Sequence, residues 1–307
     1  MPAPVESRGL ILRLLQGSTQ DPWGQDPDAF RPESARAAIQ ALRWLYGPGG
    51  YFKVEVQGWE NVPPAPVMMV GNHSGGTSIP DVWAFASQWY EHFGFERIIH
   101  PMAHEMVFST RFTGAPFTRM GVLRAQPARA VEILRRWRRD LLVMPGGDRD
   151  TWRPWTARYQ VQFAGRKGYI RTALAAGVPI VPVAHSGAHN TLLVLSDGHR
   201  LARRIGLHKV ARAQVFPIHL SLPWGLAMGP MPHWPLPTHM RYRIRPPIYP
   251  PAGWEPGQEP PPELVEELDE RVRASIQQGL DELRAERPAW RKAVADRMER
   301  ALGPPKA

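Results

Sequence analysis

Four short apolar runs alternate with stretches of helical periodicity along the first two thirds of the chain. In chain order they are Phe52 to Val56, Val67 to Val70, Leu141 to Met144 and Pro179 to Val183. The first alternates apolar and polar residues as a half-buried strand does, and the others have the pattern of buried strands. Strands separated by helical segments predict an α/β fold, in which sites form where strand ends meet loops.

Two segments have a clear helical period. Apolar residues recur at helical spacing before a Gly-Pro-Gly-Gly breaker at residues 47–50, namely at Ala35, Ile39, Leu42 and Leu45. A longer amphipathic helix is predicted from Leu264 to Leu283, with its end near Pro288. Between residues 216 and 262 proline and tryptophan are dense. Proline is excluded from helix interiors and central strands, so this part is predicted to be an irregular wrap with one edge strand at Arg241 to Arg245.

The expected organisation is one α/β domain, and 307 residues are enough to bury a full core. An N-terminal extension covers residues 1–33 and the main domain residues 34–262. The C-terminal amphipathic helix and tail cover residues 263–307. The proline-rich wrap contains too much tryptophan and leucine to be left in solvent as a linker.

The composition excludes several kinds of site and indicates which partners suit the chain. The chain has no cysteine, which excludes a disulfide framework, a thiolate nucleophile and a Cys-based zinc site. Its net charge of +10 suits anionic partners such as acidic lipid headgroups or phosphorylated cofactors. No basic block resembles a nucleic-acid reader, so nucleic acid is not expected. Without an export leader or an apolar run of about 18 residues, a cytoplasmic protein that meets the inner face of the membrane peripherally is expected.

The loop after the second apolar run carries the first candidate site. Asn72-His73 is followed by Gly75-Gly76 and, eight positions beyond the histidine, by Asp81. A carboxylate that holds one ring nitrogen of a histidine fixes its tautomer and makes the other nitrogen a better base. Eight extended residues would span roughly 26 Å, so the chain must turn back, and the glycine pair permits this.

The same segment also fits the start of a helix. Ser78 with Asp81 three positions later matches a capping pair, and Pro80 suits a first helical turn. In this interpretation Asp81 would only accept a backbone N–H. Any one of the eleven histidines is also more often structural than catalytic.

A second candidate site follows the third apolar run, where Pro145-Gly146-Gly147 is followed by Asp148-Arg149. Backbone N–H groups exposed by a glycine turn can hold an anion or a developing oxyanion, and Arg149 adds a fixed charge. The alternative is a tight turn with solvated charges.

Other chemistries have weaker support. Ser74 lies beside His73 but outside a Gly-x-Ser-x-Gly elbow. Two histidine pairs, His100 with His104 and His185 with His189, have the spacing that a metal could use on a helix. Proline or glycine interrupts each segment and neither pair has a third ligand, so no metal site is expected. The arginine cluster at residues 135–139 is most simply a solvated helix face, although it could meet anionic lipid or the phosphates of coenzyme A.

In this order the motifs resemble the glycerolipid acyltransferase superfamily, whose founding member is 1-acylglycerol-3-phosphate O-acyltransferase. The resemblance covers roughly residues 35 to 250 and rests on Asn72-His73 with Asp81, Gly121, Met144 to Gly147 and Val178 to Val183. The Asn-His-Ser-Gly-Gly…Pro-Asp pattern and the stretch Gly165 to Arg171 resemble a bacterial branch.

This sequence departs from the common family pattern at three places. The acid comes at Asp81 instead of position 78, and Gly146 stands where phosphate-acceptor members have Glu. The arginine of the second block would align near Pro127, and Arg124 is its nearest substitute. These departures leave the acceptor open.

The resemblance implies a mixed central sheet flanked by helices, as in glycerol-3-phosphate acyltransferase. It implies transfer of a fatty acyl group from acyl-coenzyme A or acyl carrier protein to a hydroxyl of a lysophospholipid, with His73 as general base and Asp81 orienting it. Substrate contacts are expected at Asn72, Gly75, Gly76, Gly121, Arg124, Pro145, Gly146, Gly147, Arg149, Arg166 and Lys167.

No cofactor beyond the thioester co-substrate is expected. A neutral-lipid acceptor, such as diacylglycerol or a long-chain alcohol, remains an alternative, as does a lipid- or nucleic-acid-binding protein without turnover. An anionic membrane surface is the expected partner, contacted by residues 35–46 and by the apolar patch Leu10 to Leu15.

Overall fold

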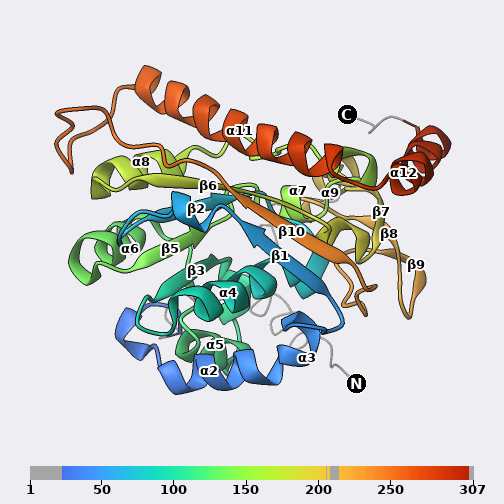
Figure 1. Ribbon diagram of the computed structural model, residues 1–307, viewed down its shortest axis with the longest axis horizontal. Coiled ribbons are helices and arrows are strands. Elements are labelled where there is room, and N and C mark those ends of the chain that lie inside the picture. Colours follow the sequence, from blue (N-terminus) through green and yellow to red (C-terminus); the bar gives the residue numbers. More distant parts are fainter. Residues whose placement is uncertain (1–22, 205, 208–213, 304–307) are drawn as a thin grey trace, which may run out of the picture.

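The computed structural model describes residues 23–204, 206–207 and 214–303. Within them, a seven-stranded sheet has the order β1-β10-β6-β2-β5-β3-β4 (Figure 1). Its strands are β1 (Lys53–Gln57), β2 (Met68–Gly71), β3 (Ile99–Ala103), β4 (Leu123–Arg124), β5 (Asp140–Val143), β6 (Ile180–Ser186) and β10 (His239–Ile244). The four strands predicted from the apolar runs are therefore confirmed as β1, β2, β5 and β6.

The sheet is mixed, and its pairing brings the two candidate sites together. β2 pairs in parallel with β5 on one side and β6 on the other, with Val70 opposite Val143 and Pro182. β10 runs antiparallel to β6 and parallel to β1. The carboxyl ends of β2, β5 and β6 consequently meet at one edge of the sheet, where α/β proteins form their sites.

Helices cover both faces of the sheet because its buried strands alternate their side chains between two cores. Met68 and Val70 belong to one core, with α8 (Gly168–Ala176) and α11 (Pro262–Ala285). Met69 belongs to the other, with α4 (Pro80–Phe93). Figure 1 shows α8 and α11 on one side of the sheet and α4 on the other, above α2 (Pro32–Ala41). This is the α/β fold, with a mixed sheet flanked by helices, that the sequence predicts.

The predicted helices form, with one addition. The segment from Ala35 divides into α2 and α3 (Arg43–Tyr46), and Ile39, Leu42 and Leu45 pack against the second core. The apolar face that was expected to contact a membrane therefore packs on the protein itself, and Leu10 to Leu15 lies outside the described residues. α11 contains the whole amphipathic stretch and ends before Pro288, after which the unforeseen α12 (Ala289–Leu302) begins.

The proline-rich wrap is more ordered than its composition predicts. β8 (Ile218–Ser221) and β9 (Gly225–Met228) form a hairpin that joins β7 (Leu193–Ser196) in a three-stranded sheet. The prediction of an edge strand was wrong, because β10 lies inside the large sheet between β1 and β6. Pro217 and Pro223 stand just outside the strands, where the missing N–H costs no ladder hydrogen bond.

The remaining helical segments are short connections. They are η1 (Pro27–Ala29), η2 (Trp59–Asn61), η3 (Gly76–Ser78), η4 (Glu105–Phe108), α5 (Arg111–Arg119), α6 (Pro127–Glu132), the π-helical η5 (Ile133–Trp137), α7 (Gly147–Thr151), η6 (Trp155–Ala157), η7 (Ala188–Asn190) and α9 (His199–Arg204). No helix in the described part of the chain is long and apolar enough to cross a bilayer.

Candidate active site

His73 and Asp81 are in direct contact at the carboxyl end of β2. His73 Nδ1 lies 2.7 Å from Asp81 Oδ2, within hydrogen-bonding distance as the sequence predicts. The Asp81 side chain is completely buried, whereas that of His73 is 14% exposed. No described residue hydrogen-bonds His73 Nε2. The ring therefore has one nitrogen held by a carboxylate and the other without a partner in the part of the chain that the structure describes.

Asp81 does not act as a conventional helix cap. Its Oδ2 also accepts the backbone N–H of Ser74 at 2.8 Å, while Oδ1 accepts that of the next residue, Val82, at 2.9 Å. Ser78 does not cap α4 either, because its hydroxyl donates to Gly75 O at 3.1 Å. Asp81 thus lies in the first turn of α4 and holds the histidine loop from there.

The glycine pair makes the turn that brings Asp81 back to His73. Gly75 has φ 101° and Gly76 φ 64°, both in the left-handed region that favours glycine. A Cβ on Gly75 would also lie 2.5 Å from Cδ of Pro80. These glycines shape the loop, and the structure gives them no other role.

Electrostatics keep Asp81 ionised. Burial alone would raise the pKa of Asp81, but the attraction and hydrogen bond of His73, with smaller contributions from His185 and the Ser74 N–H, hold it below its usual value. His185 Nε2 lies 3.5 Å from Asp81 Oδ2 and 2.7 Å from Ser74 Oγ. Burial lowers the pKa of His185 to about 4, so this second imidazole is neutral near pH 7. From the sequence, His185 was considered only as one half of a histidine pair with metal-like spacing.

Asn72 fastens β2 to β6. Its Nδ2 donates to His185 O and its Oδ1 accepts the His185 N–H, both at 2.9 Å, and its side chain is fully buried. Both ends of its amide are occupied within the protein, and the substrate contact expected of Asn72 stays a prediction. Asn72 positions the histidine loop.

An unforeseen ion pair holds the backbone of His73. Asp150 Oδ2 accepts the His73 N–H at 2.5 Å, and Asp150 Oδ1 pairs with Arg153. Arg153 Nη1 in turn donates to His73 O at 3.2 Å. Both side chains are completely buried. The stretch after β5 is therefore hydrogen-bonded to the histidine loop, as expected for two loops that follow adjacent parallel strands.

The turn at Pro145 to Gly147 comes shortly before Asp150 and Arg153, and hydrogen bonds from Arg166 hold it in place. Arg166 Nη1 donates to Pro145 O at 3.2 Å and to Gly146 O at 2.8 Å, and its Nη2 donates to Asp148 at 3.1 Å. Gly147 has φ 53°, and a Cβ there would meet the Arg166 guanidinium. Arg166 therefore fixes the turn, and the substrate contact expected of it stays a prediction.

Arg149 is the one charged residue of this stretch left without a partner among the described residues. Asp148 pairs with Arg166 and Asp150 with Arg153, whereas half-buried Arg149 makes no hydrogen bond or ion pair there. Among the described residues, the stretch consequently has a positive charge without a counter-ion, one residue from the carboxylate that holds His73.

Three predicted substrate residues lie elsewhere. Arg124 is 1% exposed in β4 at the far edge of the sheet, pairs with Glu105 and donates from Nε to Trp23 O at 2.7 Å. Gly121 O accepts from His100 Nδ1 at 2.7 Å, also away from His73. Lys167 pairs with Glu266 of α11. The polar groups of these residues join parts of the fold, and the substrate contacts expected of them stay predictions.

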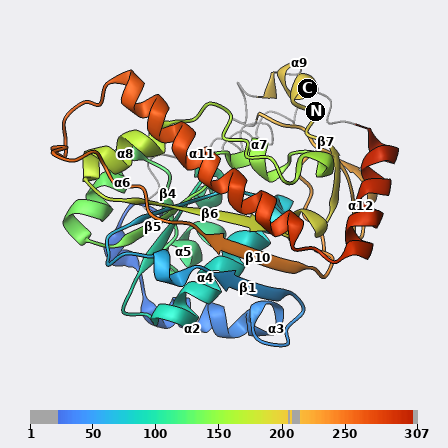
Figure 2. The ribbon, with the colours of Figure 1, turned by 45° about the horizontal axis from the view of Figure 1, so that its top comes forward.

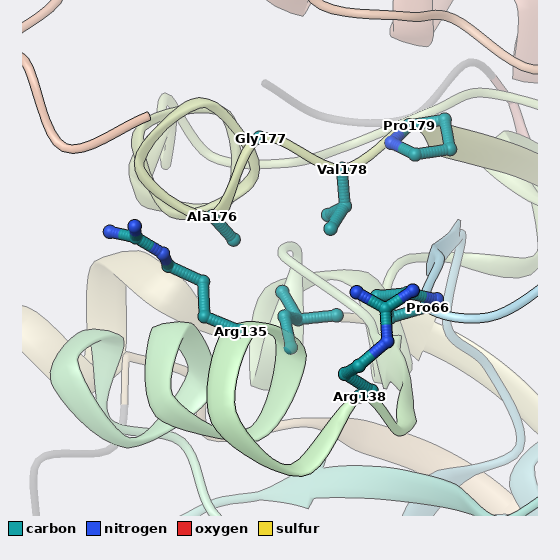
Figure 3. A pocket seen from close by; sticks show the side chains of 8 residues that line it. Pro66, Arg135, Arg138, Ala176, Gly177, Val178 and Pro179 are labelled. Atoms are coloured by element: carbon teal, nitrogen blue, oxygen red, sulfur yellow. The ribbon is translucent and has the colours of Figure 1, made fainter. Parts of the chain in front are cut away.

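The arginine cluster at residues 135–139 also lies apart from His73. Arg135 and Arg138 line a cavity of about 320 Å³ between η5 and the end of α8 (Figure 3). Pro66 and Pro179, which precede β2 and β6, line the same cavity. It therefore opens at the amino ends of these strands, opposite the edge that carries His73.

Comparison with known proteins agrees with this site. The acyltransferase family model matches residues 53–186, the segment from β1 to the end of β6 that holds His73, Asp81 and the Pro145 to Gly147 turn. The segment that carries both candidate sites is therefore similar to the acyltransferase family.

Similar chains occur in mycobacteria. An uncharacterized protein of Mycobacterium tuberculosis is 29% identical over 91% of this chain and 74% of its own length. One of Mycobacterium leprae is 28% identical over 91% of this chain and 72% of its own. Among solved structures, the 1-acyl-sn-glycerophosphate acyltransferase of Thermotoga maritima aligns with a TM-score of 0.48 and 17% identity, over 94% of this chain and 86% of that one.

Proposed function

We propose that the protein is an acyltransferase that moves a fatty acyl group from acyl-coenzyme A or acyl carrier protein to a hydroxyl of a lysophospholipid, with His73 as general base. The observation that carries the proposal is the His73 Nδ1 to Asp81 Oδ2 contact of 2.7 Å, with Nε2 left without a partner among the described residues. A neutral Nε2 accepts the hydroxyl proton as the alcohol oxygen attacks the thioester carbonyl. Buried Asp81 stabilises the imidazolium that results.

The reaction then completes without a covalent enzyme intermediate. The tetrahedral intermediate collapses, the carbon–sulfur bond breaks, and the imidazolium returns the proton to the departing thiolate. The products are the acylated acceptor and the free thiol, and His73 is neutral again. The enzyme's main contributions are proton transfer, worth roughly 10²–10⁴-fold, and orientation of the two substrates.

Arg149 supports an acceptor that carries a phosphate. Its charge is uncompensated among the described residues, and its neighbour Asp150 holds the backbone of His73. An arginine in this place suits a phosphate next to the reacting hydroxyl. A neutral acceptor such as diacylglycerol would leave this charge unused.

A serine nucleophile is the rival chemistry, since Ser74 Oγ lies 2.7 Å from His185 Nε2. Ser74 is 1% exposed and His185 2%, so a thioester has no route to this hydroxyl. Ser74→Ala should keep at least about half of the transfer rate, because the residue acts only as packing and as a local hydrogen-bond partner. A covalent acyl-Ser74 adduct found by peptide mass spectrometry would instead favour the nucleophile.

The test of function is a substrate panel. Purified protein is incubated with labelled palmitoyl-coenzyme A and, in separate reactions, with 1-acylglycerol 3-phosphate, other lysophospholipids, diacylglycerol or a long-chain alcohol, and products are identified by mass spectrometry. Acylated lysophospholipid that forms with the native chain and not with His73→Ala is the expected result. Product from diacylglycerol or the alcohol alone would show that the acceptor is a neutral lipid.

We further propose that the reaction takes place at the cytoplasmic face of an anionic membrane.

A further inference from the structure

The β8–β9 hairpin turns its apolar face to solvent. The strand register places Leu220 opposite Leu226, and their exposed fractions are 41% and 66%. Met228, two residues further along β9, is 54% exposed. On either side of Leu220 in β8, His219 is completely buried and Ser221 is 7% exposed. A hairpin that covers a soluble protein has the opposite arrangement, with apolar side chains inward and polar ones outward.

Neighbouring residues extend this face into one surface. The turn between the strands adds Leu222 and Trp224, each 50% exposed, and Leu222 forms a backbone bridge with Trp234, which is 55% exposed. We call hairpin surface the set of Leu220, Leu222, Trp224, Leu226, Met228, Trp234 and Leu236. An apolar cluster of this kind on a soluble protein marks an interaction site.

The hairpin surface continues directly into the loop that carries His73. Thr77 Oγ1 donates to Met231 O at 3.0 Å, and Ser78 Oγ lies 3.2 Å from His233 Nε2. A Cβ on Gly76 would lie 2.8 Å from Cε1 of His233. The segment after β9 thus packs on residues 76–78, between the general base and Asp81. Whatever occupies the hairpin surface lies beside the catalytic loop.

A basic helix lies at the base of the hairpin. The Phe216 N–H, just before β8, donates to Asp197 O at 2.9 Å, just before α9. Arg203 and Arg204 of α9 are exposed. Figure 2 shows α9 at the same side of the molecule as β7, the strand paired with β8. An apolar face with tryptophans at its rim and arginines beside it complements the acyl and anionic headgroup layers of a bilayer.

We propose that the hairpin surface docks on an anionic lipid bilayer and sets the His73 loop against it. The inference rests on the proposed function, because it supposes that the acceptor is a lipid held in that bilayer. Trp224 and Trp234 lie at the interface between acyl chains and headgroups, where indole rings are favoured. Arg203 and Arg204 add attraction for anionic headgroups, so binding combines apolar burial with charge.

The test uses substitutions that leave the charge unchanged. Leu226→Thr with Met228→Thr removes two exposed apolar side chains and keeps residues suited to strands. The matched controls are Phe112→Gln in α5 and Trp44→Gln in α3, which are 90% and 56% exposed and lie outside the hairpin surface. Each variant of the full chain is sedimented with vesicles of phosphatidylglycerol and phosphatidylcholine. Because two apolar side chains no longer enter the bilayer, the double variant should bind on the order of 100-fold more weakly.

The proposal predicts that both controls bind within about twofold of the native chain. Native-like binding by the double variant would overturn it. So would a dimer, seen by sedimentation velocity, that the double variant converts to monomers while vesicle binding persists, since the surface would then hold a second copy of the chain. The acyl-transfer assay separates the two proposals. A native chain that docks through the hairpin surface but transfers no acyl group would support docking and overturn the proposed function.

Discussion

Asp150 offers the sharpest test of how the catalytic loop is held. Its carboxylate accepts the His73 N–H and pairs with Arg153, which donates to His73 O, and both side chains are completely buried. Burial lowers the pKa of Arg153 to about 9, so the guanidinium is still charged at pH 7. Asp150→Asn keeps the size of the side chain but removes its charge. The substitution leaves a buried arginine without its counter-ion.

The expected loss is large because a buried charge cannot regain water. Removing one partner of a buried ion pair costs about 3–5 kcal/mol, out of a total stability of about 5–15 kcal/mol. Asp148→Asn is the matched control in the same helix. Asp148 and its partner Arg166 are 29% and 37% exposed, so this substitution should cost less than about 1 kcal/mol.

Urea denaturation followed by circular dichroism measures both variants against the native chain. An unchanged m-value would show that the difference in midpoint reports stability. Asp150→Asn should also lower kcat while the KM values change little, because Asp150 touches the backbone of His73 and no substrate. Equal losses of stability in the two variants would refute the argument that the buried pair fixes the loop.

Three further predictions concern the site. Asn72→Ala leaves the N–H and carbonyl of His185 without partners, at about 1–3 kcal/mol for each group, so it should lower the urea midpoint; an unchanged midpoint would contradict this. Arg149→Gln should raise the KM for a phosphate-bearing acceptor more than the KM for the thioester, and equal changes would count against phosphate binding. Burial lowers the pKa values of His100 and His185 to about 4 from an ordinary 6.5, so the unfolded chain binds more protons below pH 6.5. The melting temperature should therefore fall as pH drops from about 6.5 to 4, and a rise over this range would refute the assignment of neutral buried imidazoles.

The sequence predicts the parts of the fold that follow from local patterns. β2, β5 and β6 each contain a continuous apolar run, and α11 has an uninterrupted amphipathic period, so the local sequence pattern identifies them. The hairpin of β8 and β9 was missed because proline density outweighed the short strands between the prolines. The position of β10 inside the sheet depends on pairing with strands far away in sequence, which no local pattern contains.

The site shows the same division between local and distant information. His73 and Asp81 could be paired from sequence because they share one loop and the glycines there require a turn. Asp150 and Arg153 could not, because they reach His73 only through the parallel pairing of β2 with β5. His185 likewise joins the site through the pairing of β2 with β6. The charged residues that follow the Pro145 to Gly147 turn were the available signal for Asp150.

The most direct test of the central claim is a double-mutant cycle on His73 and Asp81, measured as kcat/KM for acyl transfer to 1-acylglycerol 3-phosphate. His73→Ala should abolish transfer, and Asp81→Asn should reduce it on the order of 10²-fold or more, because the carboxylate acts through the imidazole that it orients. The account predicts that the double variant is no slower than His73→Ala alone. A folded His73→Ala protein with near-native activity, or losses that add in the double variant, would contradict it.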